Sequence, residues 1–243
     1  MDKKYIPALI ISVSLIISAL IFGTFFYQAQ KDENTLKSVG IASTQFESDT
    51  VKWNINLEEK VGPENLKDGY KKINSQINRI ITILSKQGIE TSNINKKPIN
   101  VYESYEYKNQ NGNQQRIFSG YRVTQSFYIV SNKVDKIEDI AYNPLSLLEN
   151  NIVIRNSNLQ YYYSNIDKLK KEIISKAAAN ARERANKMLE HTDVNLGKTL
   201  SLNSGVFQIT EPHSTRVSSS GIYETSTKKK QIRVTVHAVY KIK

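Results

Sequence analysis

The chain of 243 residues contains no cysteine. This absence excludes disulfide frameworks, thiolate nucleophiles, iron–sulfur clusters and zinc sites with cysteine ligands. Histidine is also scarce, since only His191, His213 and His237 are present, and their spacing indicates no metal site. The chain is 39% hydrophobic and 23% charged, which is typical of a folded protein. At this length a hydrophobic core alone is expected to stabilise the fold.

The sequence motifs of several common enzyme classes are missing. No G-x-G-x-x-G, G-x-S-x-G or H-E-x-x-H pattern occurs. Residues 197–199 (Gly-Lys-Thr) resemble the end of a phosphate-binding loop, but Thr192 stands where that loop needs a glycine. Glu103 and Glu106 fall on opposite faces of a strand, so they cannot form a paired acid–base site there. We therefore predict no catalytic, cofactor-binding or metal-binding residues.

One long run without charge lies near the N-terminus. As a helix, residues 6–27 would be about 33 Å long, which matches a bilayer hydrocarbon core. The run is longer than the apolar part of a cleavable signal peptide, and the bulky Tyr27 lies two residues before the best cleavage point, Ala29. We predict an uncleaved signal-anchor in residues 1–30 that contacts the membrane through residues 6–27. A cleaved signal peptide is the alternative.

The charges beside this segment orient it only weakly, because Lys3 and Lys4 precede it and Lys31 and Lys37 follow it. A chain without cysteine fits an oxidising compartment. We therefore expect a single-pass protein of the inner (cytoplasmic) membrane, with residues 31–243 in the periplasm or otherwise outside the cytoplasm. If the segment is cleaved, the remainder is secreted or periplasmic.

Two hydrophobic periods alternate along the rest of the chain. A period of two predicts strands, and spacings of three and four predict helices. The predicted strands cover residues 49–60, 99–107, 116–130, 152–163, 198–204 and 232–242. The predicted helices cover residues 64–87, 134–142 and 164–191. This interleaving predicts an α+β fold, with long helices packed against a mixed, mainly antiparallel sheet.

Several local signals refine this prediction. Asn111-Gly112 indicates a hairpin turn, and Gly120 inside a strand indicates a bulge or a close backbone approach. Ser164 and Asp167 form a capping-box signature. Residues 31–38 are interpreted as a polar tether and residues 208–230 as a mobile loop. We expect the last strand to pair in the same sheet as the earlier ones, so that residues 31–243 form one domain.

The chain is basic, with 34 lysine and arginine residues against 23 acidic residues and a net charge of +11. No nucleic-acid-binding module is recognisable, so we expect no nucleic acid partner. An anionic lipid or polysaccharide of the cell envelope is the more accessible counter-surface for an anchored protein. A generally basic, solvated surface without a partner is the alternative.

The order of these segments resembles the SIMPL-domain family of bacterial envelope proteins, which are similar to the periplasmic immunogenic proteins and largely of unknown biochemical function. The resemblance rests on a strand that begins after Val39-Gly40 and on the following stretches: Gly88-Ile89, Gly120-Tyr-Arg-Val123, Asn132–Lys136, the alanine-rich Lys176–Lys187 and Leu196-Gly-Lys198. It implies an α+β domain over residues 38–243, an extracytoplasmic location and homo-oligomers, and it brings no catalytic residues. The chain departs from the family at Asn150-Asn151, where glycine is common.

Two classes of function follow from the sequence. The first is a non-enzymatic, membrane-anchored extracytoplasmic protein that acts through assembly, binding or association with the envelope. The absence of any reactive constellation supports this prediction. The alternative is an extracytoplasmic enzyme whose carboxylate and tyrosine side chains are scattered along the sequence.

Overall fold

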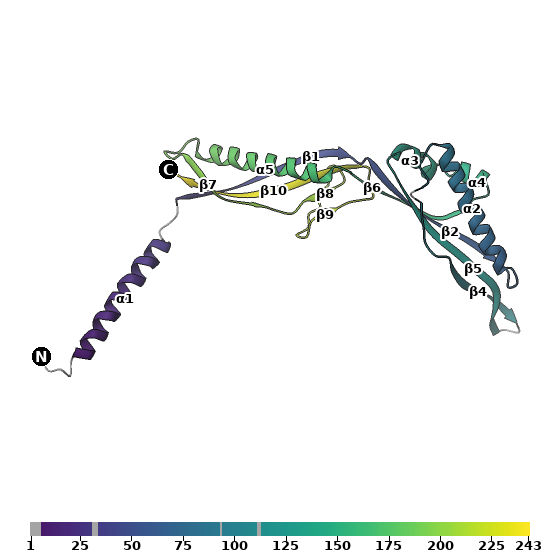
Figure 1. Cartoon of the computed structure of the whole chain (residues 1–243), viewed down its shortest axis with the longest axis horizontal. Helices are drawn as coiled ribbons and strands as arrows, with labels where there is room; N and C mark the ends of the chain where they lie inside the picture. Colours follow the sequence, from purple (N-terminus) through teal and green to yellow (C-terminus); the bar gives the residue numbers. More distant parts are fainter. Residues whose placement is uncertain (1–5, 31–33, 93, 111–112) are drawn as a thin grey trace. The chain divides into compact units, whose positions relative to one another are not determined.

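A computed structural model describes residues 6–30, 34–92, 94–110 and 113–243 (Figure 1). The chain forms two compact units. The first holds Met1–Ala42, Ile174–Gly205 and Thr235–Lys243, and the second holds Ser43–Ile173 and Val206–Val234. The flanking lysines 3, 4 and 31 and the expected turn at 111–112 lie outside the described residues.

The second unit contains a five-stranded antiparallel sheet. Its strands are β2 (Thr50–Val61), β3 (Ile94–Lys96), β4 (Asn100–Gln110), β5 (Asn113–Ser131) and β6 (Ile154–Tyr162). β2 and β5 pair along eleven residues, β6 pairs with β2, and β3 and β4 both pair with β5. The strands predicted from alternation are therefore confirmed, and β3 is an addition.

One face of this sheet is covered by helices. α2 (Leu66–Lys86) lies along β2 and β5, and α3 (Val134–Tyr142) and α4 (Leu145–Glu149) complete the layer (Figure 1). The core between them contains Trp53, Phe127 and Ile77, all at most 1% exposed. On the apolar face of α2, Ile73, Ile77, Ile80 and Leu84 are buried, Leu66 is partly buried, and Tyr70 is 39% exposed. Gly69 is buried in the first turn of the helix instead, because its missing side chain leaves room for Val123.

A second sheet contains β1 (Thr35–Glu47), β7 (Leu196–Ser204), β8 (Gln208–Thr210), β9 (Ile222–Tyr223) and β10 (Lys229–Ile242). Its strand order is β1-β10-β8-β9, and β7 also pairs with β10. The α+β class is confirmed, but the closing strand β10 lies in a different sheet from β2 and β5. Hydrophobic alternation specifies which face of a strand is buried, not which strand it pairs with.

The first unit also holds α1 (Ile6–Gln30) and most of α5 (Ile166–Leu189). Ala177, Ala181 and Ala185 of α5 are fully buried, and a side chain on Gly40 of β1 would overlap the backbone of Ala177 and Ala181. The small side chains of this helix therefore allow a close approach to β1. The tether prediction is wrong for Thr35–Ser38, which belong to β1.

Three local predictions have different outcomes. Gly120 has a φ of 136°, lies beside the register shift between β4 and β5, and contacts the carbonyl of Val61 too closely for a side chain, so the bulge and the close approach are both confirmed. The Ser164 N–H donates to Asp49 Oδ1 at 2.9 Å, where a capping box would have it donate to Asp167, and the Ser164 hydroxyl donates to Asp49 Oδ2 at 2.5 Å. The loop prediction for residues 208–230 is wrong for β8, β9 and the first residues of β10, which lie within this segment.

Candidate functional site

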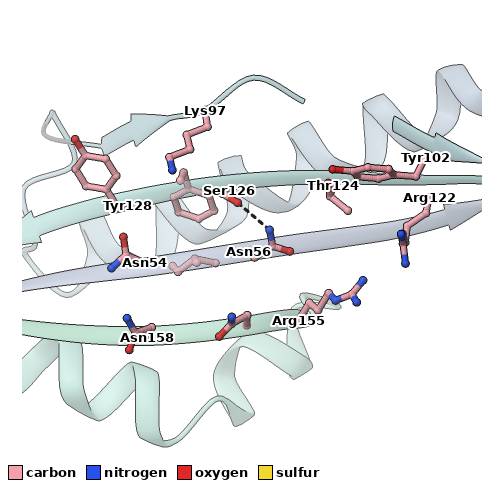
Figure 2. Close-up of a pocket in the computed structure, with 13 residues that line it drawn as sticks. Asn54, Asn56, Lys97, Tyr102, Arg122, Thr124, Ser126, Tyr128, Arg155 and Asn158 are labelled. Atoms are coloured by element: carbon pink, nitrogen blue, oxygen red, sulfur yellow. Dashed lines mark hydrogen bonds between the residues drawn. The ribbon is translucent and has the colours of Figure 1, made fainter. Parts of the chain in front are cut away.

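The sheet face opposite α2 is built from the polar positions of three strands. On β2, Asn54 and Asn56 alternate with core residues, and the strand pairing extends each of them into a row across the sheet. Asn54 is paired with Tyr128 of β5 and Asn158 of β6. In the next row, Asn56 is paired with Ser126 and Asn156. We call this surface the asparagine face, and Figure 2 shows its side chains pointing to one side of the strands.

The asparagine face is hollowed. A cavity of about 680 Å³ lies over it, open to solvent. Apart from Ile55 and Phe127, its lining residues are polar, aromatic or cationic, and none carries a carboxylate. The cationic members are Lys97, Arg122 and Arg155. Amide and hydroxyl side chains form hydrogen bonds with hydroxyl groups, and cationic side chains bind negative charge. The lining is therefore suited to a ligand that carries both.

Hydrogen bonds fix part of the asparagine face. The Asn56 amide donates to Ser126 Oγ at 2.8 Å (Figure 2), and the Asn54 amide donates to Gln160 Oε1 at 3.2 Å. Asn156 and Asn158 are exposed, and their side chains make no hydrogen bond to other described residues. Their amide groups are therefore free to donate and accept at the mouth of the cavity.

The cationic side chains are positioned by the fold. Arg155 is the extra residue where the pairing of β2 and β6 shifts register, and such bulges redirect a side chain. Its guanidinium forms an ion pair with Glu58, which also lies 3.8 Å from Arg122 Nε. Glu58 is largely buried, with 14% of its side chain exposed, so it holds the two arginines side by side. The two guanidinium groups share this one carboxylate.

Lys97 and the tyrosines complete the two ends of the cavity (Figure 2). The backbone of Lys97 is held on both sides, because its N–H donates to Ser126 O at 2.9 Å and its carbonyl accepts from Gln125 Nε2 at 2.8 Å. The Lys52 ammonium lies 4.2 Å from the ring centroid of Tyr128, and Arg122 lies 5.2 Å from that of Tyr102. One side of each ring is thus occupied by a cation.

Residues 36–240 match the SIMPL family, described as a protein of unknown function (DUF541). The chain belongs to the SIMPL family. The match begins in β1 and ends in β10, so it includes segments of both compact units. No curated protein matches the chain.

At Asn150-Asn151 of this SIMPL chain, where the resemblance leads us to expect glycine, the backbone adopts a conformation that glycine favours. Asn151 has a φ of 53°, which is the left-handed region that glycine enters freely. Asparagine is the non-glycine residue that tolerates this region best, because its short polar side chain can bond locally. Asn151 can therefore form the turn that leads the chain from α4 into β6 without a glycine.

A second polar cluster of the SIMPL chain joins tyrosines and carboxylates that are distant in sequence. The Tyr161 hydroxyl donates to Glu138 Oε1 at 2.6 Å and lies 3.1 Å from the Tyr142 hydroxyl. Burial and the hydrogen bond to Glu138 raise the pKa of Tyr161, so the phenol stays protonated. If the protein were an enzyme that uses carboxylate and tyrosine side chains, these residues would be the candidates for its active site.

Lys228 closes the same cluster. Its Nζ lies 2.5 Å from Asp135 Oδ1, 3.1 Å from Glu47 Oε1 and 3.4 Å from Glu138 Oε2. The hydrogen bonds to Asp135 and Glu47 raise the pKa of Lys228, so its amine stays charged at neutral pH. The arrangement ties three elements, β1, α3 and β6, to the segment before β10.

The candidate site residues considered in the sequence analysis lie outside both the asparagine face and the cluster of Tyr161 and Glu138. Gly197-Lys198-Thr199 lies in β7, and among the described residues no group of three or more histidine, aspartate and glutamate side chains forms a metal site. Glu103 accepts a hydrogen bond from Tyr105, its neighbour on the same strand face. Tyr102, Tyr105 and Tyr107 all lie on β4, where the high β-propensity of tyrosine accounts for them, and of the three only Tyr102 lines the cavity.

Sequence reasoning missed the asparagine face, although a signal was present. Asparagine is disfavoured in strands, yet it occupies alternate positions at 54 and 56 and again at 156 and 158. Strand pairing brings the two pairs into adjacent rows. From the sequence alone, Asn156-Ser157-Asn158 indicates a bend or a break in the strand, whereas β6 is continuous through these residues.

Proposed function

We propose that this protein is a membrane-anchored, extracytoplasmic SIMPL protein that acts by binding a component of the cell envelope, without catalysing a reaction. The observation that carries the proposal is α1. Its segment Ile10–Gln28 has a mean hydropathy of 2.2, and none of it is buried within the structure. Large apolar side chains along it, such as Leu15 and Phe22, are 65% and 71% exposed.

The geometry of α1 supports a membrane span. Nineteen helical residues measure about 28 Å, close to the thickness of the bilayer hydrocarbon core. The hydroxyls of Ser14 and Thr24 donate to the carbonyls of Ile11 and Ile21 at 2.9 and 2.8 Å, so these polar groups are satisfied within the helix. Exposed apolar side chains over this length favour lipid as their surroundings rather than water.

The asparagine face supports the binding role. Its amides, hydroxyls and cations are held on a rigid sheet, and the face is open rather than enclosed. Binding sites commonly combine such fixed polar groups with a concave surface. The tyrosine–carboxylate cluster supports the same proposal, since its titratable groups are paired with one another.

Cysteine labelling tests the proposed topology, because any introduced cysteine is the only thiol in the chain. Ser175 is exposed on α5, whereas Ser48 is 3% exposed. In cells with an opened outer barrier, we expect a membrane-impermeant maleimide to label Ser175→Cys without lysis. Ser48→Cys is the matched control and is expected to react only after denaturation. The labelled protein should remain full-length and membrane-bound in high salt, since apolar burial is not screened.

Two results would contradict parts of the proposal. Labelling of Ser175→Cys only after lysis would place the SIMPL region in the cytoplasm. A labelled protein that is shortened and soluble would show that the N-terminal segment is a cleaved signal peptide.

A further inference from the structure

We infer that the asparagine face binds a strand of acidic polysaccharide, lying over β2, β5 and β6 and held by amides along its length and by arginines at one end. The inference rests on the proposed extracytoplasmic location, which gives this face access to envelope polysaccharide. It adds the chemical class of the ligand and the residues that recognise it.

The amides supply recognition of hydroxyl groups. Each asparagine side chain offers two donor hydrogens and one acceptor oxygen, which is the pairing that a sugar hydroxyl needs. Asn156 and Asn158 are two residues apart on β6, so their side chains repeat about every 7 Å along the strand. Asn54 and Asn56 repeat in register beside them. The face therefore presents repeating polar groups to a repeating ligand.

The cations supply recognition of negative charge. Arg122, Arg155 and Lys97 line the cavity without any acidic lining residue. Glu58 beneath them balances only one of the two arginines, and it keeps both guanidinium groups in place. Guanidinium groups bind carboxylate and phosphate through paired hydrogen bonds. An acidic substituent on the sugar would complete this end of the face.

The composition of the face disfavours two other polyanions. A lipid would need apolar surface for its acyl chains, whereas the outward side chains of β2, β5 and β6 at the cavity are polar or aromatic. Single-stranded nucleic acid binds through aromatic platforms on which bases stack. Here Lys52 lies over one side of the Tyr128 ring and Arg122 over one side of the Tyr102 ring, so each ring leaves only its other side for a base. Hydroxyl-rich, acidic chains fit the amides and cations together.

The test uses the full-length protein in neutral detergent and titration calorimetry with a defined oligogalacturonate. The same oligosaccharide with its carboxyl groups methyl-esterified is the matched ligand without charge. We expect the esterified chain to bind at least about tenfold more weakly, because the charge-assisted bonds to the arginines are lost. Equal affinity for the two chains would overturn the inference.

Variants locate the binding on the protein. Arg155→Gln should weaken binding of the oligogalacturonate about tenfold, and Asn158→Ala should weaken it about fivefold. Both side chains are exposed, and circular dichroism checks that the fold is retained. Lys168→Gln on α5 removes an exposed charge outside the cavity and should leave the affinity unchanged. If Lys168→Gln weakens binding as much as Arg155→Gln, a diffuse basic surface replaces the proposed site.

Two further ligands test whether the asparagine face binds lipid or single-stranded nucleic acid instead. Vesicles of phosphatidylglycerol and a single-stranded oligothymidine are tested with the same variants. If Arg155→Gln and Asn158→Ala weaken binding to either of these but not to the oligogalacturonate, the inference is wrong and the face recognises that other class. A negative labelling experiment would contradict only the proposed extracytoplasmic location. The calorimetry would still test binding of the polysaccharide.

Discussion

Lys230 is a fully buried amine in the second unit. Its Nζ donates to the carbonyl of Thr227 and lies 5.9 Å from the ring centroid of Tyr161. Burial lowers the pKa of Lys230 from its ordinary value of 10.5 to about 8, although the charge of Glu224 acts in the opposite direction. The folded protein therefore carries a charge at pH 7 that its surroundings disfavour.

The Lys230→Met variant should be more stable than the natural protein at pH 7. The expected gain is roughly 1 to 2 kcal/mol, because an apolar side chain of similar length avoids the desolvation of the amine. Between pH 8 and 10.5 the unfolded chain still holds the proton that the folded protein has released. The stability of the natural protein therefore rises across this range relative to the variant, and the gain shrinks.

Thermal unfolding at pH 7 and pH 10 measures this difference. Lys229→Met is the matched control, since Lys229 is the exposed neighbour on β10 and should show little change at either pH. A gain for Lys230→Met that is equal at the two pH values would mean that the amine does not titrate near 8.

At the scale of single residues, the sequence predicted backbone conformation better than it predicted which residues are in contact. Gly120 was interpreted correctly, because its need for an unusual backbone is a local property. Ser164 was interpreted as a cap on local spacing, but it bonds Asp49, which is 115 residues away in the chain. The burial of Lys230 was equally hidden, since it depends on which side of β10 is covered.

At the scale of elements, the contact between α5 and β1 depends on small side chains. Ser38 Oγ donates to Ala181 O at 2.8 Å, and the Ile41 N–H donates to Asn180 Oδ1 at 3.1 Å. Gly40 lies between these two bonds, in contact with the helix backbone. The hydrogen bonds and the missing side chain together set the distance between the strand and the helix.

Gly40→Ala should separate these elements and destabilise the first unit. The added carbon would overlap backbone atoms, which cannot move aside as a flexible side chain can, so a loss of about 3 kcal/mol is expected. Gly62→Ala is the control, because the nearest atom to its added carbon would be Asn65 Nδ2 at 3.6 Å. Denaturation of the full-length protein, followed by circular dichroism, measures both variants. A Gly40→Ala variant as stable as Gly62→Ala would contradict the close approach.

The elements were predictable to the extent that their periodicity was strong. The apolar spacing of three and four residues in α2 predicted both the helix and its buried face, and the period of two in β2 did the same for the strand. β1 was missed over its first residues because Lys37 and Ser38 interrupt its apolar pattern, while Gly40, its contact with α5, carries no side chain to signal burial. The partners of β10 could not be derived, since a strand that is buried on one face pairs equally well in either sheet.

At the scale of the whole molecule, two hydrophobic clusters differ in size. In the second unit a large cluster includes Trp53, Phe127, Ile77 and other residues of the sheet and its helices. In the first unit a cluster is formed by Ala181, Ala185, Ala238 and Tyr240, with Leu36 and Leu196 packed against it. Less apolar surface is buried around alanines, so this cluster contributes less to stability.

Hydrogen exchange at increasing denaturant concentration should separate the two clusters. We expect amides of β7 and of α5 near Ala181 to become exchangeable at lower denaturant than amides of β2 beside Trp53, because regions with small cores open first. The fluorescence of Trp53, the only tryptophan in the chain, reports independently on the large cluster. Gly40→Ala should accelerate exchange in the first group and leave the β2 amides and the fluorescence midpoint unchanged. If instead all amides and the fluorescence respond at one denaturant concentration, residues 31–243 unfold as the single cooperative domain that the sequence predicts.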